Sequence, residues 1–210
     1  MCRTPWQQPL EEFLWNPPGT SSNGAAYITV MASFEDEILF ETPYVHVKRE
    51  KNTGYDLVTF PVPAGAVVVP RRIARGEAYF GFVTQFRHTT LTETLEFPRG
   101  GALPGEAHLD AAARELAEET GHVVESARGI DLGPIWPDTG ILRSDVRAAM
   151  FTITGLPGVP SPDETEGDIQ FRWLSVGHVL GAIATNRIVC GMTLSAWSKV
   201  TARGFDIVPY

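Results

Sequence analysis

The sequence predicts a mixed α/β (α+β) fold, in which a sheet of short strands is covered by a few helices. Runs rich in β-branched and aromatic residues, which favour strands, occur at residues 65–70, 78–87 and 169–174. Between them, residues 107–120 are rich in Ala, Leu and Glu and contain no Gly or Pro, which is typical of a helix. Two more helices are expected after residue 174, the first with Ser175 as its N-cap.

The chain is expected to divide into an N-terminal region, residues 1–62, and a main domain, residues 63–210. Short alternating runs between residues 27 and 62 predict a small antiparallel β-region ahead of the main sheet. Residues 1–26 are interrupted by Pro, Gly and Ser and predict an arm. Two alternatives remain for this arm: an unstructured tail, or a segment docked against the domain or a second subunit.

Composition narrows the classes of function. The 210 residues carry a formal net charge of −8, which argues against broad nucleic-acid binding through a basic surface. Two cysteines, Cys2 and Cys190, cannot make a disulfide framework, and a reducing compartment fits. No apolar run reaches the length of a membrane span, and the N-terminus has no signal-peptide core. We therefore expect a cytoplasmic protein with a small-molecule substrate and neither a nucleic-acid nor a membrane partner.

The helix at residues 107–120 has one apolar face and one acidic face. The residues expected to be buried are Leu109, Ala112, Ala113, Leu116 and Thr120. Glu115, Glu118 and Glu119 gather elsewhere on the helix at i,i+3 and i,i+4 spacing, where like charges repel. A solvated acidic surface is one interpretation. A site for a hard divalent cation such as Mg²⁺, which prefers carboxylate oxygens, explains the pattern better.

A longer pattern surrounds this helix. Gly100 is followed after five residues by Glu106, and after seven more by Arg114-Glu115-Leu116-x-Glu118-Glu119-x-Gly121. This pattern resembles the signature box of the Nudix hydrolases at every polar and glycine position. It departs at the last position, where His122 replaces the usual apolar residue. The resemblance implies an α/β/α sandwich with a mixed sheet and the box helix packed on one face.

The segments that flank the box strengthen the resemblance. Gln85-Phe86-Arg87 and Glu96-Phe97-Pro98-Arg99-Gly100 are similar to the family's strand end and to its approach to the box. Pro137 matches a proline that marks the ADP-ribose pyrophosphatase subgroup. In related enzymes the arginine matching Arg87 lies near the substrate. The alternative for Arg87 is an ordinary salt bridge at the end of a strand.

The resemblance and the helix pattern together assign roles to the box residues. Glu115 and Glu119 are the expected ligands of Mg²⁺, with Mn²⁺ as a substitute, and Glu118 is a third ligand or an outer partner. The resemblance adds the backbone carbonyl of Arg99 as a ligand. Arg114 is expected to orient one of the glutamates through a charge-assisted hydrogen bond.

A catalytic base is expected in the acidic loop at residues 155–168, because the resemblance places a general-base glutamate on a late loop. Glu164 and Glu166 are both candidates, and the tether of the following strand favours Glu166 slightly. A solvated acidic loop is the alternative. If neither glutamate acts, Glu118 is the next candidate.

These expectations lead to one favoured function and two alternatives. The favoured function is Mg²⁺-dependent hydrolysis of the pyrophosphate bond in a nucleoside diphosphate linked to another group, either ADP-ribose or a nucleotide sugar. The alternatives are a Nudix hydrolase acting on dinucleotides, coenzymes or nucleoside triphosphates, and a module that binds a nucleotide sugar without cutting it. The resemblance also implies a homodimer built partly from residues 27–62.

Overall fold

The computed structural model describes residues 36–161 and 169–208 of the chain. Its strands are β1 (Asp36–Glu41), β2 (His46–Glu50), β3 (Asp56–Ala74), β4 (Glu77–Arg87), β5 (Thr92–Glu96), β6 (Arg99–Gly101), β7 (Ile130–Ile135), β8 (Leu142–Thr152) and β9 (Gln170–Ser175). The helices are α1 (His108–Thr120), the 3-10 helix η3 (Ser126–Arg128), α2 (Val176–Ala184) and α3 (Gly191–Ala202). The N-terminal arm and the loop that carries Glu164 and Glu166 lie outside the described residues. None of the described helices is long and apolar enough to cross a membrane.

The strands form one nine-stranded sheet, with β3 at its centre. This strand pairs antiparallel with β2, β4 and β6 and parallel with β8. The strands β5 and β9 pair with β4, and β7 pairs with β8, all antiparallel. The sheet is therefore mixed, as the sequence predicts.

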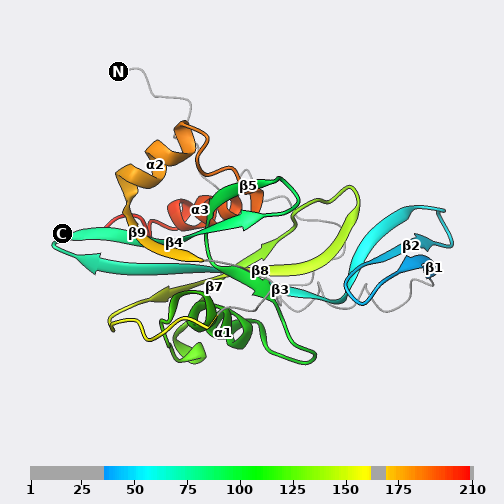
Figure 1. The fold of residues 1–210 in the computed structure, drawn as a ribbon, viewed down its shortest axis with the longest axis horizontal. Helices are drawn as coiled ribbons and strands as arrows, with labels where there is room; N and C mark the ends of the chain where they lie inside the picture. The colour runs from blue at the N-terminus through cyan, green and yellow to red at the C-terminus, as the bar shows by residue number, and fades with distance from the viewer. Residues whose placement is uncertain (1–35, 162–168, 209–210) are drawn as a thin grey trace, which may run out of the picture.

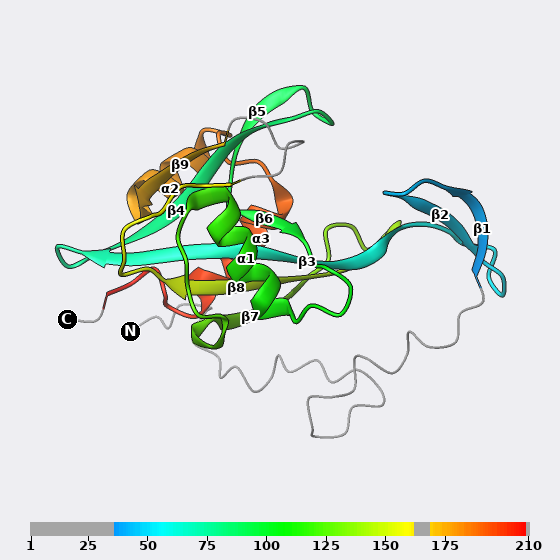
Figure 2. The same ribbon diagram turned by 60° about the horizontal axis from the view of Figure 1, so that its bottom comes forward.

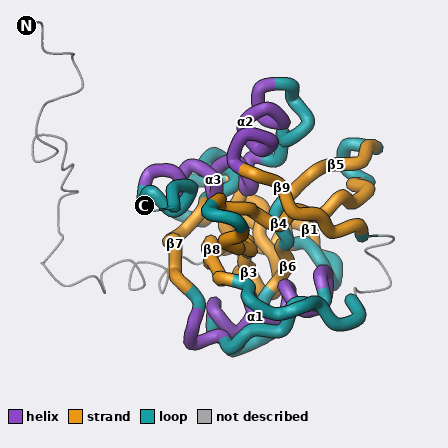
Figure 3. Tube along the Cα trace, turned by 90° about the vertical axis from the view of Figure 1, so that its left-hand side faces the viewer, coloured by secondary structure: helices purple, strands orange, loops and turns teal. Residues whose placement is uncertain are grey.

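Alternate residues of β3 divide the core into two layers, because successive side chains of a strand point to opposite faces. Val67 and Val69 pack in a cluster with Trp197 of α3. Val68 packs in a second cluster with Leu116 of α1. Figure 1 shows α1 on one side of the sheet and α2 and α3 on the other, and the end-on view of Figure 3 shows the same three layers. The predicted α/β/α sandwich is confirmed.

The strand β3 is longer than the sequence predicts. We expected two separate runs, at residues 55–60 and 65–70, with the domain boundary between residues 62 and 63, but β3 runs unbroken for 19 residues. The segment between the two runs contains Pro61 and Pro63. Proline has no N–H to donate, yet its fixed φ suits an extended backbone at an irregular site. The register between β3 and β8 shifts between Thr59 and Ala64, so both prolines lie at such an irregularity. The expected boundary between residues 62 and 63 therefore falls within a continuous strand.

The described part of the N-terminal β-region is a hairpin that extends from the sandwich. The strands β1 and β2 pair antiparallel, and β2 pairs with the first part of β3. Figures 1 and 2 show this hairpin projecting from one end of the sandwich, beyond the end of the central strands. It exposes the apolar side chains of Ile38, Leu39, Phe40 and Tyr44. An antiparallel β-region is thus present where the sequence predicts one.

Candidate active site

The helix α1 carries the acidic residues of the box and lies close to its predicted bounds. It ends at Gly121, whose left-handed φ of 74° and N–H bond to the Ala117 carbonyl form the expected cap. Leu116 and Ala112 are buried as predicted, but Glu115 and Glu119 are buried too, with only 5% and 1% of their surface exposed. A carboxylate resists burial unless a cation or hydrogen bonds compensate its charge. The interpretation of this face as a solvated acidic surface therefore does not hold for Glu115 and Glu119.

Gly100 leaves the space that the Glu115 side chain occupies. A Cβ atom built on Gly100 would overlap the carboxylate carbon and both carboxylate oxygens of Glu115. The carboxylate of Glu115 thus lies directly against the backbone of β6. The carbonyl of Arg99, the expected backbone ligand, belongs to the peptide that leads into Gly100. The structure therefore brings together two expected ligands that are 16 residues apart in the sequence.

Arg114 connects the acidic residues on this side of the helix. Its Nη1 atom donates to Glu115 Oε1 and to Glu118 Oε2, each at 2.8 Å. Its Nε and Nη2 atoms donate to Glu106 at 3.0 Å each, and Nη2 also donates to the Gly101 carbonyl at 2.7 Å. These bonds, first of all those with Glu106, raise the pKa of Arg114 above its ordinary value. Arg114 therefore contacts three glutamates, where the sequence predicts that it orients one.

The residues present fit a divalent metal ion. Glu115 and Glu119 offer hard carboxylate oxygens at i,i+4 spacing, Glu118 is partly exposed beside them, and Gly100 leaves room for the Glu115 carboxylate. Among the described residues, no group of three or more acidic, His or Cys side chains converges closely enough to hold a metal. The Arg114 guanidinium instead bridges Glu115 and Glu118. These three side chains would have to rearrange around a bound ion.

The loop that carries the candidate bases follows β8, and its described part, up to Ser161, contacts the C-terminal end of α1. The Gly158 N–H donates to the Gly121 carbonyl at 2.7 Å, and the Ser161 N–H donates to the Glu118 carbonyl at 2.8 Å. A Cβ atom on Gly121 would collide with the Gly158 carbonyl, so this approach requires glycine. The chain is therefore held against the box helix just before residues 162–168. Glu164 and Glu166 themselves lie outside the described residues.

His122, the residue that departs from the family pattern, is buried next to the box. Its Nδ1 atom lies 3.0 Å from the Thr120 hydroxyl, and its ring packs against Phe171 and Trp173 of β9. Burial lowers the pKa of His122 below its ordinary value, which favours the neutral ring. The departure is thus accommodated by aromatic packing.

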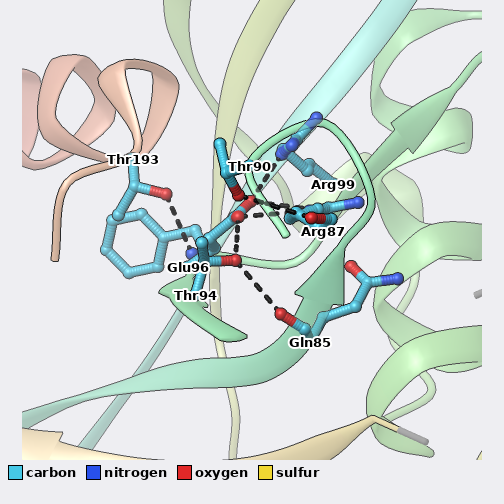
Figure 4. Close-up of polar contacts among 8 residues, drawn as sticks. Gln85, Arg87, Thr90, Thr94, Glu96, Arg99 and Thr193 are labelled. Atoms are coloured by element: carbon cyan, nitrogen blue, oxygen red, sulfur yellow. Dashed lines mark hydrogen bonds and ion pairs between the residues drawn. The ribbon is translucent and has the colours of Figure 1, made fainter. Parts of the chain in front are cut away.

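A second polar cluster lies where β4, β5 and β6 meet (Figure 4). Arg87 donates from Nε and Nη2 to the two carboxylate oxygens of Glu96, at 3.1 and 3.0 Å. Arg99 donates from Nε to Glu96 Oε2 at 2.8 Å, and the Thr94 hydroxyl donates to Oε1. The strand-end salt bridge considered for Arg87 is therefore present, and its substrate contact remains a prediction. No role was predicted for the Glu96 side chain from the sequence, although an acidic residue between two arginines in the approach to the box was a signal.

Glu96 is ionised despite being only 2% exposed. Burial alone would raise its pKa, but hydrogen bonds from Arg87, Thr94 and Arg99 and the charge of Arg99 outweigh it and lower the pKa to about 2. A group whose pKa is depressed on folding adds stability above its unfolded pKa and loses it as the pH falls through the folded value. The contribution of Glu96 is therefore complete above about pH 4.5 and declines towards pH 2.

Glu96→Gln is expected to lower the free energy of unfolding at pH 6.5 by up to about 3 kcal/mol, the equivalent of this pKa shift. The deficit should shrink as the pH is lowered from 4.5 to 3, because wild-type Glu96 itself begins to protonate. Urea unfolding across this range measures it, with Glu93→Gln on the exposed surface of the same strand as the control. A deficit that is constant with pH would contradict the assignment.

An apolar cleft of about 730 Å³ opens beside Gly100, and Arg99 lies in its wall. The largest apolar residues of the wall are Tyr44, Phe60, Leu103, Leu142 and Met192, and Pro137 also belongs to it. They come from the β1–β2 turn, the first part of β3, the loop after β6, the start of β8, the start of α3 and the loop after β7. The volume lies within the range typical of small-molecule sites, about 300–1,000 Å³. The sequence indicated Pro137 only as a subgroup marker, and it did not indicate Tyr44 or Phe60.

Comparison with known proteins agrees with this geometry. A sequence model described as the NUDIX domain matches residues 62–189, which include the box helix, the Glu96 cluster and most of the sheet. A search of curated proteins found no match. Members of this family generally use divalent metal ions such as Mg²⁺. The match covers more than half of the chain, and we conclude that this protein belongs to the NUDIX domain family, hydrolases that act on nucleoside diphosphate-linked substrates.

Proposed function

We propose that this protein is a Mg²⁺-dependent pyrophosphohydrolase of ADP-ribose or a nucleotide sugar. The observation that carries the proposal is the apolar cleft that begins at Arg99 and Gly100, next to the buried carboxylate of Glu115. A diphosphate held at the box would place one of its organic groups in this cleft. Tyr44 and Phe60 offer aromatic surface to a base or a sugar. A substrate with an organic group at each end of the diphosphate would use the cleft and the box at once.

A second cavity, of about 520 Å³, lies beyond the C-terminal end of α1 and includes Arg128 and Thr154 in its wall. It meets the box only through His122, whose ring is packed against β9. Neither Gly100 nor Arg99 belongs to its wall. We therefore assign the substrate to the cleft beside Gly100.

The proposed function assigns a role to each of the expected site residues. A Mg²⁺ ion held by Glu115, Glu119 and the Arg99 carbonyl, with Glu118 as a third side-chain ligand or an outer partner, would neutralise charge on the phosphate oxygens and acidify an attacking water. Arg114, which now bridges Glu115 and Glu118, would orient one of the glutamates once these side chains had rearranged around the ion. A loop glutamate would accept the proton of the water, and Arg87 would contact the substrate.

A hydrolysis panel tests this function directly. With Mg²⁺ present, the purified protein is given ADP-ribose, UDP-glucose, a dinucleotide and ATP, and the release of nucleoside monophosphate is measured. The proposal expects the highest kcat/KM on ADP-ribose or UDP-glucose. Faster cleavage of the dinucleotide or of ATP would favour the alternative substrates. Tight binding of a nucleotide sugar without cleavage would favour a non-catalytic module.

The described segments that flank residues 162–168 support a base at Glu166 or Glu164. Ser161 is bonded to the carbonyl of Glu118 on the box helix, and Gln170 pairs with Thr84 in the sheet, so the chain is held on both sides of these residues. Substituting the base, Glu166→Gln or Glu164→Gln, is expected to lower kcat by about a hundred- to ten-thousand-fold. The two variants are measured separately, and Glu166→Gln is expected to show the larger loss. A loss below tenfold in both would move the base to Glu118.

We also propose a homodimer that uses the N-terminal β-region. The hairpin of β1 and β2 exposes Ile38, Leu39 and Phe40, which favours a protein partner over solvent. One chain has a mass of 23.0 kDa, and light scattering at micromolar concentration should give twice this value. A monomer would reject this assembly.

A further inference from the structure

Two arginines share one buried carboxylate beside the cleft. Glu96 is 2% exposed, whereas the side chains of Arg87 and Arg99 remain 23% and 25% exposed. The two guanidinium groups come from β4 and β6 and meet on the same carboxylate (Figure 4). Two positive charges and one negative charge leave the group with a net charge of +1.

The hydrogen bonds to Glu96 use only part of the donors of each arginine. Arg87 engages its Nε and Nη2 atoms, and Arg99 engages only Nε. Each guanidinium has five N–H groups in a fixed plane. Among the described residues, Nη1 of Arg87 and both Nη atoms of Arg99 have no hydrogen-bond acceptor. These donors are therefore free to bind an acceptor from outside the described part of the chain.

A purely structural role accounts for one of the arginines but not for both. Arg87 alone satisfies both oxygens of Glu96 through a two-point contact, and Thr94 adds a further hydrogen bond. Arg99 brings a second, partly buried charge that Glu96 cannot neutralise as well. A partly desolvated cation that is not neutralised attracts an anion. Arg99 also lines the cleft, so this anion would be a bound ligand.

The strand β6 brings the charge of Arg99 close to the acidic residues of the box helix. The next residue, Gly100, lies against the carboxylate of Glu115. The arginine pair and the expected metal ligands thus approach the same short strand, β6. A phosphate chain bound there would lie between the two arginines and the metal ion expected at the glutamates, with positive charge on both sides.

We propose that the side chains of Arg87 and Arg99 form a two-arginine anion site for a phosphate group of the substrate, with Glu96 as the residue that positions them. The site rests on the proposed function for its natural ligand. It adds a role for the Arg99 side chain, separate from that of its carbonyl. It also explains why an ionised glutamate is buried between the strands. Its ligands are diphosphates that carry an organic group, and inorganic pyrophosphate is a minimal probe.

Metal-free binding tests the site independently of catalysis. With EDTA present, titration calorimetry measures the Kd of ADP and of pyrophosphate for the full-length protein. Arg99→Met keeps the backbone carbonyl and much of the side-chain length but removes the charge. It is expected to raise both Kd values about tenfold or more, since charge-assisted hydrogen bonds are the strong ones. Arg99→Lys should recover part of this loss, and the binding should weaken as salt is added.

Arg147→Met is the matched control, because Arg147 is also a partly exposed arginine in an ion pair, with Asp131. Its Kd values should equal those of the wild type. Glu96→Gln removes a negative charge but also the carboxylate that positions both guanidinium groups, so it is expected to raise Kd by less than Arg99→Met does. If Glu96→Gln does not fold, the Kd values of Arg99→Met and Arg99→Lys alone test the anion site.

Several outcomes would overturn the anion site. They are unchanged binding by Arg99→Met, an equal loss in Arg147→Met, and no metal-free binding of either probe by the wild type at millimolar concentration. The hydrolysis panel separates a failure of the anion site from a failure of the proposed function. Hydrolysis by the wild type with unchanged binding in Arg99→Met rejects only the anion site. Weakened binding in Arg99→Met with no hydrolysis by the wild type rejects only the function.

Discussion

Glu119→Gln is expected to lower kcat by about a hundredfold or more without disturbing the fold. Glu119 is 1% exposed on the face of α1 that carries Glu115, and glutamine keeps its shape while removing its charge. A metal ion contributes several kcal/mol of charge stabilisation to a hydrolytic transition state, and each 1.36 kcal/mol corresponds to tenfold in rate. Glu115→Gln should behave similarly. The measurement is kcat at saturating Mg²⁺ on the best substrate of the panel.

Thermal unfolding separates metal binding from chemistry in these variants. A ligand that binds only the folded state raises its stability, so Mg²⁺ should raise the Tm of the wild type. In Glu119→Gln this increase should disappear, because the variant lacks one of the expected ligands of the ion. Glu77→Gln, on the exposed start of β4, is the control and should match the wild type. A near-normal rate for Glu119→Gln at saturating Mg²⁺ would remove Glu119 from the ligand set.

Gly100→Ala is expected to have the second largest effect, from a single added methyl group. The new Cβ atom would overlap the carboxylate of Glu115, which must then move away from β6. Displacement of a catalytic group by about 1 Å can cost about a hundredfold in rate. We therefore expect a loss of about this size in kcat, together with a weaker response of the Tm to Mg²⁺.

The neighbouring glycine provides the comparison. A Cβ atom on Gly101 would meet no described atom within 4 Å, so Gly101→Ala should lose far less activity. Circular dichroism should show the same secondary structure for both variants. Equal activity in Gly100→Ala and Gly101→Ala would mean that the Glu115 carboxylate need not lie against β6 during catalysis.

The sequence by itself determined the elements that depend on local interactions. The helix α1 begins and ends where its composition and Gly121 predict, because helix propensity and a left-handed cap act within a few residues. The spacing of Glu115, Glu118 and Glu119 is likewise a property of helical geometry. The run at residues 65–70 was also readable as a buried strand, because a strand covered on both faces is apolar at successive positions. The continuity of β3 with the run before it was not readable, because the segment between the two runs lies where the pairing with β8 is irregular.

Only the tertiary structure decided the contacts between residues far apart in the chain. Gly100 accommodates Glu115, Arg87 and Arg99 meet on Glu96, and Tyr44 of the hairpin shares a cleft with Met192 of α3. The residue types in these contacts are common, and no local rule selects one partner over another. They follow from strand pairing across the sheet, in which β4 and β6 both pair with β3 and β5 pairs with β4. The sequence therefore indicated the chemistry of the box, whereas the paths of β3 and β6 decided which side chains surround it.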